Sequence, residues 1–271
     1  MVATISVLRK AGTSIGLYTY GMSTEQPVIL ITGAARRVGA EIGRSLHAVG
    51  ARLVLHYRTS ALEAVALAAE LNATRPGSVV CAPADLCDVA QIPRLVAIAI
   101  EKFGRLDALV NNASSFYATP IGSIDEAAWQ DLIGSNLKGP LFLAQAAAPL
   151  LREARGAIVN ITDIHAEFPL KNYPLYCAAK AGLLGLTRAL ALELAPEVRV
   201  NAVAPGPIAW PEGPAAADFD MAARNAIIGR TPLQHEGSPA DIARTVRFLL
   251  FDAPYVTGQA INVDGGRSTC L

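Results

Sequence analysis

Short apolar runs alternate with longer amphipathic patterns along almost the whole chain from Pro27 onward. The runs are expected to be strands at residues 28–32, 52–56, 78–82, 108–110, 157–161, 198–202 and 260–263. The helices are expected at residues 37–49, 61–72, 88–103, 136–152, 173–194 and 239–250, with a further helix opening at 123–126. Because these strands are so apolar, neither of their faces is expected to be exposed to solvent. The alternation therefore predicts a parallel sheet covered by helices on both sides. The pattern indicates an α/β, doubly wound fold with seven strands.

Two stretches depart from the alternation. Residues 1–24 have no clear period and are expected to form a loosely ordered N-terminal tail, with Met22 as an alternative start. Residues 205–237 are rich in Pro, Gly and Ala and are predicted to be irregular, with a short helix near 215–228. No shift in composition marks a second domain, so residues 25–271 are predicted to form one domain. The segment at about 207–237 is its expected substrate loop.

Three serines are interpreted as helix caps. Ser60 precedes the helix at 61–72, and Ser238 precedes Pro239 at the first helical position, where proline is favoured. Ser123 opens an S-x-x-E capping box that ends at Glu126. These signals support the predicted helix starts.

The composition argues against a protein that binds nucleic acid, spans a membrane or holds a metal. The 271 residues include 23 basic and 23 acidic side chains, so no net charge indicates nucleic acid or a membrane surface as a partner. No apolar run approaches the ~20 residues of a membrane span, and the first residues make a poor signal peptide. The four cysteines form no C-x-x-C pair and have no histidine at metal spacing. A cytoplasmic protein with reduced thiols and no metal site is expected.

The first strand-to-helix turn predicts a nucleotide site. It reads Thr32-Gly33-Ala34-Ala35-Arg36-Arg37-Val38-Gly39. A glycine-rich turn here places backbone N–H groups and a helix N-terminus against a phosphate. Glycine alone is common in such turns, but the position at the first strand of an alternating chain favours a cofactor.

The end of the second predicted strand indicates which cofactor. The stretch is His56-Tyr57-Arg58-Thr59-Ser60, and it lacks the acidic residue that binds the ribose 2′-OH in NAD-specific folds. Arg58 and the hydroxyls of Thr59 and Ser60 suit a 2′-phosphate instead. The alternative is a solvated turn with one arginine. NADPH is therefore the predicted cofactor.

A tyrosine, a lysine and an aspartate form the candidate catalytic group. Tyr176 and Lys180 are four residues apart and share one face of the helix predicted at 173–194. An adjacent ammonium stabilises a phenolate, so we expect Lys180 to lower the pKa of Tyr176 from about 10. Asp163 follows the strand at 157–161, at the sheet edge where such folds bind ligands. A Tyr-x-x-x-Lys pair alone is common, and the other motifs decide its meaning.

These motifs together resemble those of the short-chain dehydrogenase/reductase family over residues 27–266. The resemblance is carried by Thr32-Gly33…Gly39, Asp85, Asn111-Asn112-Ala113, Asn136, Tyr176-x-x-x-Lys180, Pro205-Gly206 and Val263-Asp264-Gly265-Gly266. It implies a Rossmann-type domain and a homotetramer, with the helices at 136–152 and 173–194 and the C-terminal segment at interfaces. It also implies cofactor contacts from Gly33, Arg37, Val38, Gly39, Tyr57, Arg58, Thr59, Ser60, Asp85, Leu86, Asn112, Ala113, Ser114, Tyr176, Lys180, Gly206 and Ile208.

Two departures from the usual family pattern point to a subgroup. Arg37 replaces the middle glycine of the turn, and Asp163 replaces the usual catalytic serine. With the stretch Asn111-Asn112-Ala113-Ser114-Ser115-Phe116-Tyr117, these residues resemble pteridine reductases, including bacterial dihydromonapterin and dihydrofolate reductases. A carboxylate would repel the alkoxide that develops in ketone reduction. In pterin reduction it can accept from N–H groups or relay a proton through Tyr176.

The resemblance implies a role for each residue of the site. The catalytic set is Asp163, Tyr176, Lys180 and Asn136, and the substrate set is Arg37, Ser114, Phe116, Asp163 and Tyr176. The pterin is expected to stack between the nicotinamide and Phe116, with Arg37 reaching the cofactor phosphate and the pterin and Ser114 contacting both ligands. Lys180 is expected to hold the ribose hydroxyls, and Asn136 to complete a proton relay through Lys180 and water.

Other interpretations of single residues stay open. Arg37 could be a surface helix residue, and Phe116 could belong to the core. Asp163 could only cap a loop while Thr162 replaces the serine, which is disfavoured because the Thr162 side chain points to the opposite face of the strand. No role beyond packing is predicted for Trp210.

The predicted function is NADPH-dependent reduction of a C=N bond in a pterin, dihydropterin or dihydrofolate. The first alternative is reduction of a 3-oxoacyl thioester or another carbonyl on the same scaffold. The second is a regulator that binds NADP without catalysis, which the intact Tyr176 and Lys180 pair disfavours. Which pterin is the substrate is left open.

Overall fold

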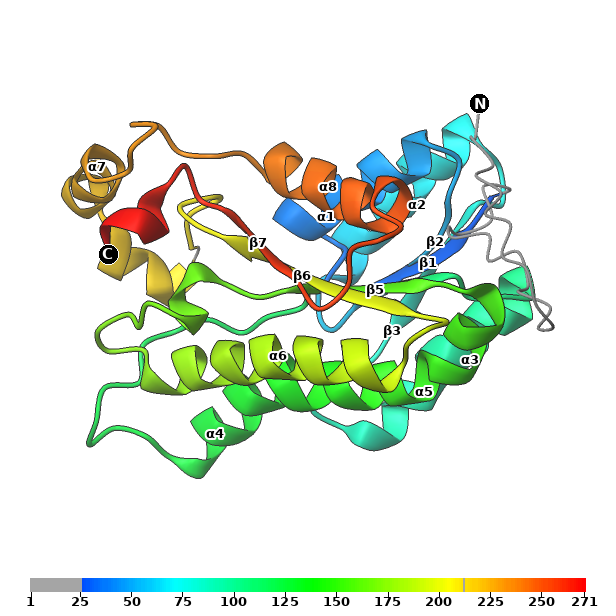
Figure 1. Cartoon of the computed structure of the whole chain (residues 1–271), viewed down its shortest axis with the longest axis horizontal. Coiled ribbons are helices and arrows are strands. Elements are labelled where there is room, and N and C mark those ends of the chain that lie inside the picture. The colour runs from blue at the N-terminus through cyan, green and yellow to red at the C-terminus, as the bar shows by residue number, and fades with distance from the viewer. Residues whose placement is uncertain (1–25, 212) are drawn as a thin grey trace, which may run out of the picture.

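The computed structural model describes residues 26–211 and 213–271, so the tail predicted at 1–24 lies outside the described residues. All seven predicted strands are present in one parallel sheet with the order β3-β2-β1-β4-β5-β6-β7 (Figure 1). The strands are β1 (Val28–Ile31), β2 (Arg52–Tyr57), β3 (Val79–Pro83), β4 (Ala108–Asn111), β5 (Ala157–Ile161), β6 (Arg199–Pro205) and β7 (Ala260–Val263). The strand order reverses between β1 and β4, which opens a crevice at their carboxyl ends. The predicted doubly wound, Rossmann-type domain is confirmed.

Helices cover both faces of the sheet. They are α1 (Arg37–Ala48), α2 (Ala61–Thr74), α3 (Ile92–Phe103), α4 (Glu126–Ile133), α5 (Gly139–Ala154), α6 (Pro174–Glu193), α7 (Met221–Gly229) and α8 (Pro239–Arg247). Helices α1, α2 and α8 lie on one side, and α3, α5 and α6 lie on the other (Figure 1). The apolar runs of the strands follow from this arrangement, because side chains alternate between two buried layers.

Strand β1 illustrates the two layers. Ile29 and Ile31 pack into the core beneath α1 and α8, whereas Val28 and Leu30 pack into the core beneath α3 and α5. All four side chains are fully buried. Burying each of them contributes roughly 1.5–3 kcal/mol, so β1 anchors the turn that follows it.

Ser60 and Ser238 stand at the predicted N-cap positions of α2 and α8, whereas the predicted cap of α4 differs from the structure. The cap of α4 is Asp125, whose Oδ1 accepts from the N–H of Ala128 at 2.8 Å, so the box predicted to start at Ser123 is wrong. Asp125 stands one residue before the helix, where its carboxylate reaches the third amide. Ser60 makes no capping hydrogen bond with its side chain. The capping box of Ser238 with Asp241 at the start of α8 is present.

The helix predicted at 136–152 starts differently. Helix α4 continues into a π-helical turn, η2 (Gly134–Lys138), which leads directly into α5. A Cβ at Gly134 would lie 2.6 Å from the Sγ of Cys87, and one at Gly139 would lie 2.9 Å from the Cβ of Leu86. The turn is thus packed tightly against the segment after β3, and it carries Asn136. A π turn of this kind often marks a functional site.

Other boundaries shift for local reasons. The predicted helix at 88–103 is a short 3-10 turn, η1 (Val89–Gln91), followed by α3, and Asp88 caps the turn. Helix α8 ends in a second π turn, η5 (Phe248–Asp252). The irregular segment contains a 3-10 helix, η4 (Gly213–Phe219), and then α7.

Helix α6 bears on the expectation that no segment of the chain spans a membrane. It has 20 residues and a mean hydropathy of 1.3 over its best window, which is long and apolar enough for a membrane span by length and composition. Half of that window is buried within the protein, as in the core helix of a globular domain. It packs along the sheet and carries a buried lysine, Lys180. Its apolar character is therefore weak evidence for a membrane span.

Candidate active site

Asp163, Tyr176 and Lys180 meet at the carboxyl end of β5. The Oη of Tyr176 donates to the Oδ2 of Asp163 at 2.6 Å. The Nζ of Lys180 lies 5.7 Å from the centroid of the Tyr176 ring and donates to the carbonyl of Ile161 at 2.9 Å. Asp163 also accepts from the N–H of His165 at 2.8 Å. The carboxylate is thus held in place by a backbone amide while it binds the phenol.

Burial and the carboxylate decide the protonation of Tyr176. The side chain is buried, and both this burial and the charge of Asp163 raise its pKa well above 10. The expectation that Lys180 lowers this pKa is wrong, because Asp163 binds the phenol directly and the ammonium does not. Burial lowers the pKa of Lys180 to about 8, against the opposing effect of Asp163. At neutral pH the phenol therefore carries its proton, and the lysine is largely charged.

Thr162 uses its hydroxyl within the sheet. The hydroxyl donates to the carbonyl of Val203 at 3.1 Å, and the side chain is buried. Thr162 also lines the cavity, so its predicted direction, toward the opposite face of the strand, stays a prediction. Asp163 is the residue that binds the phenol of Tyr176 directly.

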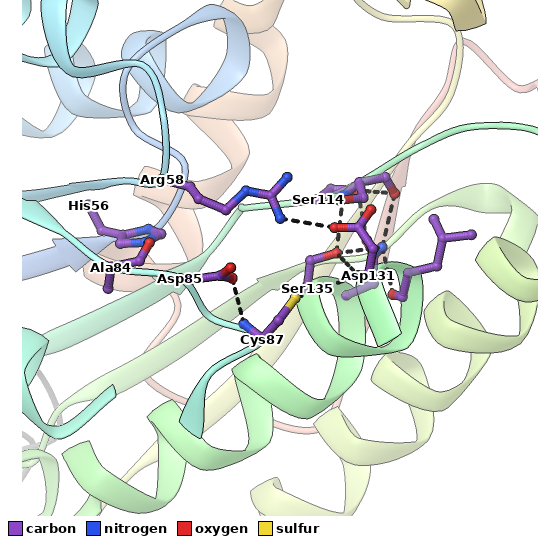
Figure 2. A network of polar contacts seen from close by, with 11 residues as sticks. His56, Arg58, Ala84, Asp85, Cys87, Ser114, Asp131 and Ser135 are labelled. Atoms are coloured by element: carbon purple, nitrogen blue, oxygen red, sulfur yellow. Dashed lines mark hydrogen bonds and ion pairs between the residues drawn. The ribbon is translucent and has the colours of Figure 1, made fainter. Parts of the chain in front are cut away.

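Asn136 holds the segment after β4. Its Oδ1 accepts from the Oγ of Ser114 at 2.7 Å, and its Nδ2 donates to the carbonyls of Ser115 and Leu132 at 2.9 and 3.0 Å. Figure 2 shows this network between η2 and the loop that bears Ser114. The ammonium of Lys180 binds a carbonyl elsewhere. The relay role of Asn136 stays a prediction.

The glycine turn is tightly packed against neighbouring backbone atoms. Gly33 has φ +61°, and a Cβ there would lie 2.8 Å from the Cα of Ala113. A Cβ at Gly39 would lie 2.2 Å from the carbonyl oxygen of Gly33. The Nδ2 of Asn112 donates to the carbonyls of Thr32 and Gly33 at 2.9 and 3.0 Å. Both glycines are required by space, and the turn leaves room for a phosphate at the N-terminus of α1.

His56 supports this turn and was not singled out from the sequence. Its Nδ1 accepts from the N–H of Gly33 at 3.2 Å, so its Nε2 carries the proton and donates to the carbonyl of Ala84 at 3.1 Å. Burial lowers the pKa of His56 to about 4, which keeps the ring neutral. The available signal was a polar residue near the end of an otherwise apolar strand.

Arg58 has a partner that the sequence did not reveal. Its Nη1 lies 2.9 Å from the Oδ1 of Asp131 on α4 (Figure 2). Asp85 lies next to the pair and accepts from the N–H of Cys87 at 2.9 Å. Within the described part of the chain, the other guanidinium nitrogens of Arg58 have no hydrogen-bond partner. Arg58 can therefore meet a second anion, and its contact with a 2′-phosphate stays a prediction.

One cavity of about 560 Å³ joins these groups, a size typical of a small-molecule site. Asn136 is the exception among the predicted site residues, because it supports the wall from behind. The cavity is lined by Gly33, Arg37, Val38, Gly39, Tyr57, Arg58, Thr59, Ser60, Asp85, Leu86, Asn112, Ala113, Ser114, Phe116, Asp163, Tyr176, Lys180, Gly206 and Ile208. Within the described residues, no three His, Cys, Asp or Glu side chains form a potential metal site.

Aromatic side chains build the wall at the catalytic end. The ring of Phe116 stacks on Tyr173 with centroids 4.6 Å apart and meets Tyr176 edge-on at 4.7 Å. Phe219 lies 6.0 Å away. Phe116 packs in an apolar cluster and also lines the cavity, and its predicted stacking on a pterin stays a prediction. The sequence analysis missed Tyr173 and Phe219.

Side chains also tie the irregular segment to the domain. The guanidinium of Arg37, a residue with φ +53°, donates to the carbonyls of Ala209 and Trp210. The indole of Trp210 donates to Glu236 at 2.5 Å. The hydroxyl of Tyr173 donates to Asp218 at 2.6 Å. Arg37 therefore contacts the loop in this structure, and its predicted contacts with ligands stay predictions.

Comparison with known proteins agrees with the fold and the motifs. A family model described as enoyl-(acyl carrier protein) reductase matches residues 33–268. The chain is 40% identical to pteridine reductase 1 of Leishmania tarentolae, over 91% of this chain and 98% of that protein. It is 37% identical to a 3-oxoacyl-(acyl-carrier-protein) reductase of a Synechocystis species, over 88% and 96%. A Staphylococcus aureus reductase of the same name is 36% identical, over 88% and 96%. The chain therefore belongs to the short-chain dehydrogenase/reductase family, as an oxidoreductase built on a single Rossmann-type domain.

Proposed function

We propose that the protein is an NADPH-dependent reductase of a C=N bond in a pterin, dihydropterin or dihydrofolate. The observation that carries the proposal is the hydrogen bond of 2.6 Å between the phenol of Tyr176 and the carboxylate of Asp163. This pair replaces the neutral hydroxyl that a carbonyl reductase of this fold places beside its tyrosine. The difference bears directly on which substrate can be reduced.

The charge of Asp163 argues against a carbonyl substrate. Reduction of a ketone develops negative charge on oxygen, and a carboxylate beside the proton donor would repel that charge. Reduction of a C=N bond instead requires a proton on the ring nitrogen. The amino-pyrimidine edge of a pterin offers N–H donors, which a carboxylate can accept. A pterin therefore complements Asp163.

The protonation of Tyr176 suits the same chemistry. Because its pKa is raised well above 10, the phenol keeps its proton at neutral pH and can donate it to the ring nitrogen. NADPH, when bound, supplies the hydride. Lys180 lies beneath the Tyr176 ring and is largely charged below its pKa of about 8. Its ammonium stabilises the phenolate that remains after the proton has left.

The residues of the other end of the cavity fit NADPH. Gly33 and Gly39 allow the turn to close against neighbouring protein atoms that a Cβ would meet, and the N-terminus of α1 that follows the turn suits a phosphate. The end of β2 has no acidic residue for a ribose 2′-OH, and Arg58 there retains free donors. These features support NADPH over NADH.

The percentage identity to these relatives does not by itself distinguish a pterin substrate from a 3-oxoacyl thioester. The relative named as a pteridine reductase is 40% identical, and those named as 3-oxoacyl-(acyl-carrier-protein) reductases are 37% and 36% identical. Asp163 favours the former activity. Reduction of a 3-oxoacyl thioester is the second candidate, because the remaining family motifs are compatible with it.

A substrate panel tests the proposal. Purified protein is mixed with NADPH and, in turn, biopterin, 7,8-dihydrobiopterin, dihydrofolate or an acetoacetyl thioester, and the loss of NADPH absorbance is recorded. We expect NADPH consumption with at least one pterin or folate. Consumption of NADPH with the thioester alone would contradict the proposal and support a carbonyl reductase. The variant Tyr176→Phe, run in parallel, shows that any activity belongs to this site.

The homotetrameric assembly and the cytoplasmic location implied by the family resemblance stay predictions. Sedimentation equilibrium of the purified chain measures the first. Fractionation of cells that express the chain measures the second.

A further inference from the structure

Arg267 brings a guanidinium without an acidic partner to the substrate end of the cavity. It opens the last turn, η6 (Arg267–Cys270), and lines the cavity together with Phe219 and Ile227. Its Nη1 donates to the carbonyl of Ile227 at 3.3 Å. Within the part of the chain that the structure describes, no ion pair joins Arg267 to a carboxylate. Most of its donors are therefore free for a ligand.

The backbone places Arg267 at this point. The preceding Gly265 and Gly266 have φ +64° and +84°, and these values turn the chain back toward the end of α7. A Cβ at Gly265 would lie 2.8 Å from the Cγ2 of Thr231, and the carbonyl of Gly265 accepts from the N–H of Leu233 at 3.1 Å. The turn is packed against the segment after α7. Arg267 is thus presented to the cavity by a fixed turn.

The surroundings of Arg267 are positive. Arg230 does not line the cavity, but it directly precedes Thr231, which packs on Gly265. Burial and the charge of Arg230 lower the pKa of Arg267. Asp264 opposes this effect, but its two oxygens accept from the N–H groups of Gly266 and Ser268 at 2.9 and 2.8 Å. The charge of Asp264 is thus shared with the backbone of its own turn. We call Arg230 and Arg267 the cationic corner.

The acidic groups of the loop are bound to other partners. Asp218 accepts from the hydroxyl of Tyr173, and Glu236 accepts from the indole of Trp210. Neither carboxylate forms an ion pair with the cationic corner within the described residues. Among the described residues, no carboxylate therefore forms an ion pair with Arg230 or Arg267.

We propose that the cationic corner is a subsite for an anionic tail on the substrate. The proposal rests on the proposed pterin reductase, whose reacting ring lies at Phe116 and Tyr176. Phe219 faces Phe116 at 6.0 Å and lines the cavity with Arg267, so a tail that leaves the ring along Phe219 reaches the corner. A guanidinium binds carboxylate and phosphate groups with two parallel hydrogen bonds. The tail is therefore a glutamyl carboxylate or a phosphate ester.

Three dihydropterins and the variant Arg267→Gln separate the possibilities. Dihydrofolate carries carboxylates, 7,8-dihydroneopterin phosphate carries a phosphate ester, and 7,8-dihydrobiopterin carries a neutral tail. We expect kcat/KM of Arg267→Gln to fall about tenfold for at least one anionic substrate, through KM, as for the loss of one charge-assisted contact. Turnover of 7,8-dihydrobiopterin and the Kd of NADPH are expected to stay unchanged. Arg267→Lys retains the charge and is expected to recover most of the loss.

Matched controls guard against a structural effect. Arg247→Gln removes an exposed arginine of α8 that does not line the cavity, and it is expected to leave all three substrates unchanged. If Arg267→Gln fails to fold, the exposed Arg230→Gln is expected to lower kcat/KM for the anionic substrate about threefold, as for a more exposed charge.

Each outcome decides between the proposals. A loss confined to dihydrofolate identifies a carboxylate tail, a loss confined to the phosphate identifies that ester, and a loss for both supports their shared chemistry. An equal loss for all three substrates, or no loss, overturns the subsite and leaves the pterin reductase standing. A wild-type protein that reduces neither these three substrates nor biopterin overturns both proposals.

Discussion

The two ends of the cavity are constructed differently. At the cofactor end, backbone groups define the shape: the chain leaves no room for a Cβ at Gly33 or Gly39, and His56 and Asn112 bind main-chain atoms of the turn. At the substrate end, side chains contact other side chains. Tyr176 binds Asp163, and the Phe116 ring packs on aromatic neighbours. The shape of the cofactor end is set by the backbone of the sheet and its first turn. The shape of the substrate end is set by side chains that the sheet supports.

This difference separates binding from selectivity. A backbone turn binds the common part of a cofactor whatever the substrate, and it tolerates no added atom. A wall of side chains can be exchanged without altering the sheet, so substrate preference can change while the fold remains. Substitutions at the two ends are therefore expected to fail in different ways.

The largest effect is expected at the substrate end, from a pair of tyrosines. Tyr176→Phe removes the proton donor and should lower kcat about 1000-fold with little change in the Kd of NADPH. Tyr173→Phe removes a phenol that also binds an aspartate, Asp218, but that lies outside the proposed reaction. It should change kcat less than about fivefold, because the lost hydrogen bond to Asp218 does not involve the reacting atoms. Steady-state kinetics and a fluorescence titration of NADPH measure both, and equal losses in kcat would contradict the assigned roles.

The next effect is expected at the cofactor end. Gly39→Ala places a Cβ 2.2 Å from the carbonyl oxygen of Gly33 and should cost about 3 kcal/mol, at the upper end for overpacking. Gly229→Ala, in α7, meets no atom within 4 Å and should leave stability unchanged or slightly raised. Denaturant unfolding of both variants compares them. A loss in Gly229→Ala as large as in Gly39→Ala would contradict the spatial argument.

A pH-dependent loss of stability should follow from His56. Its pKa is about 4 in the folded protein and about 6.5 when unfolded, so the unfolded chain binds the proton first. Stability is therefore full above pH 6.5 and is lost as the pH falls towards 4, by up to about 3 kcal/mol. The variant His56→Gln lacks this titration. Its unfolding free energy, measured from pH 7 to 4, should fall less steeply than that of the wild type, and parallel curves would exclude the effect.

A smaller effect is expected where a side chain assists the cofactor end. Arg58→Ala should raise the Kd of NADPH about tenfold while that of NADH stays nearly constant, because only NADPH carries a 2′-phosphate. Arg52→Ala serves as the control, because Arg52 lies on β2, the strand that precedes Arg58, and does not line the cavity. Equal weakening of both cofactors by Arg58→Ala would show that it does not recognise the 2′-phosphate.

The same contrast explains what could be predicted from the sequence. All seven strands were found because each contains a short apolar run, and the central strands β1, β4 and β5 are buried on both faces. The cofactor turn was found because its glycines and the following helix are contiguous in sequence. Helix starts were less certain because Asp125 and Ser123 both resemble caps, and only the folded chain shows which amide is reached.

Contacts between side chains were harder to predict at both ends because they join residues distant in sequence. Arg58 and Asp131, at the cofactor end, are 73 residues apart, and Tyr173 and Asp218, at the substrate end, are 45 apart. No local pattern connects such pairs. The pKa of Tyr176 was wrongly predicted for the same reason, because spacing revealed Lys180 on the same helix but not the direct bond from Asp163. Contiguous motifs can be identified in a sequence, whereas contacts that arise on folding require the structure.

The central claim is that Asp163 selects a C=N substrate, and the most direct test is the ratio of two kcat/KM values. The ratio compares 7,8-dihydrobiopterin with an acetoacetyl thioester in the wild type and in Asp163→Ser, with Thr162→Val as the neighbouring control. We expect the wild type to favour the pterin and Asp163→Ser to lose at least about 100-fold on it while gaining on the thioester. Thr162→Val should keep the wild-type preference. A ratio that is the same in the wild type and in Asp163→Ser would contradict the claim.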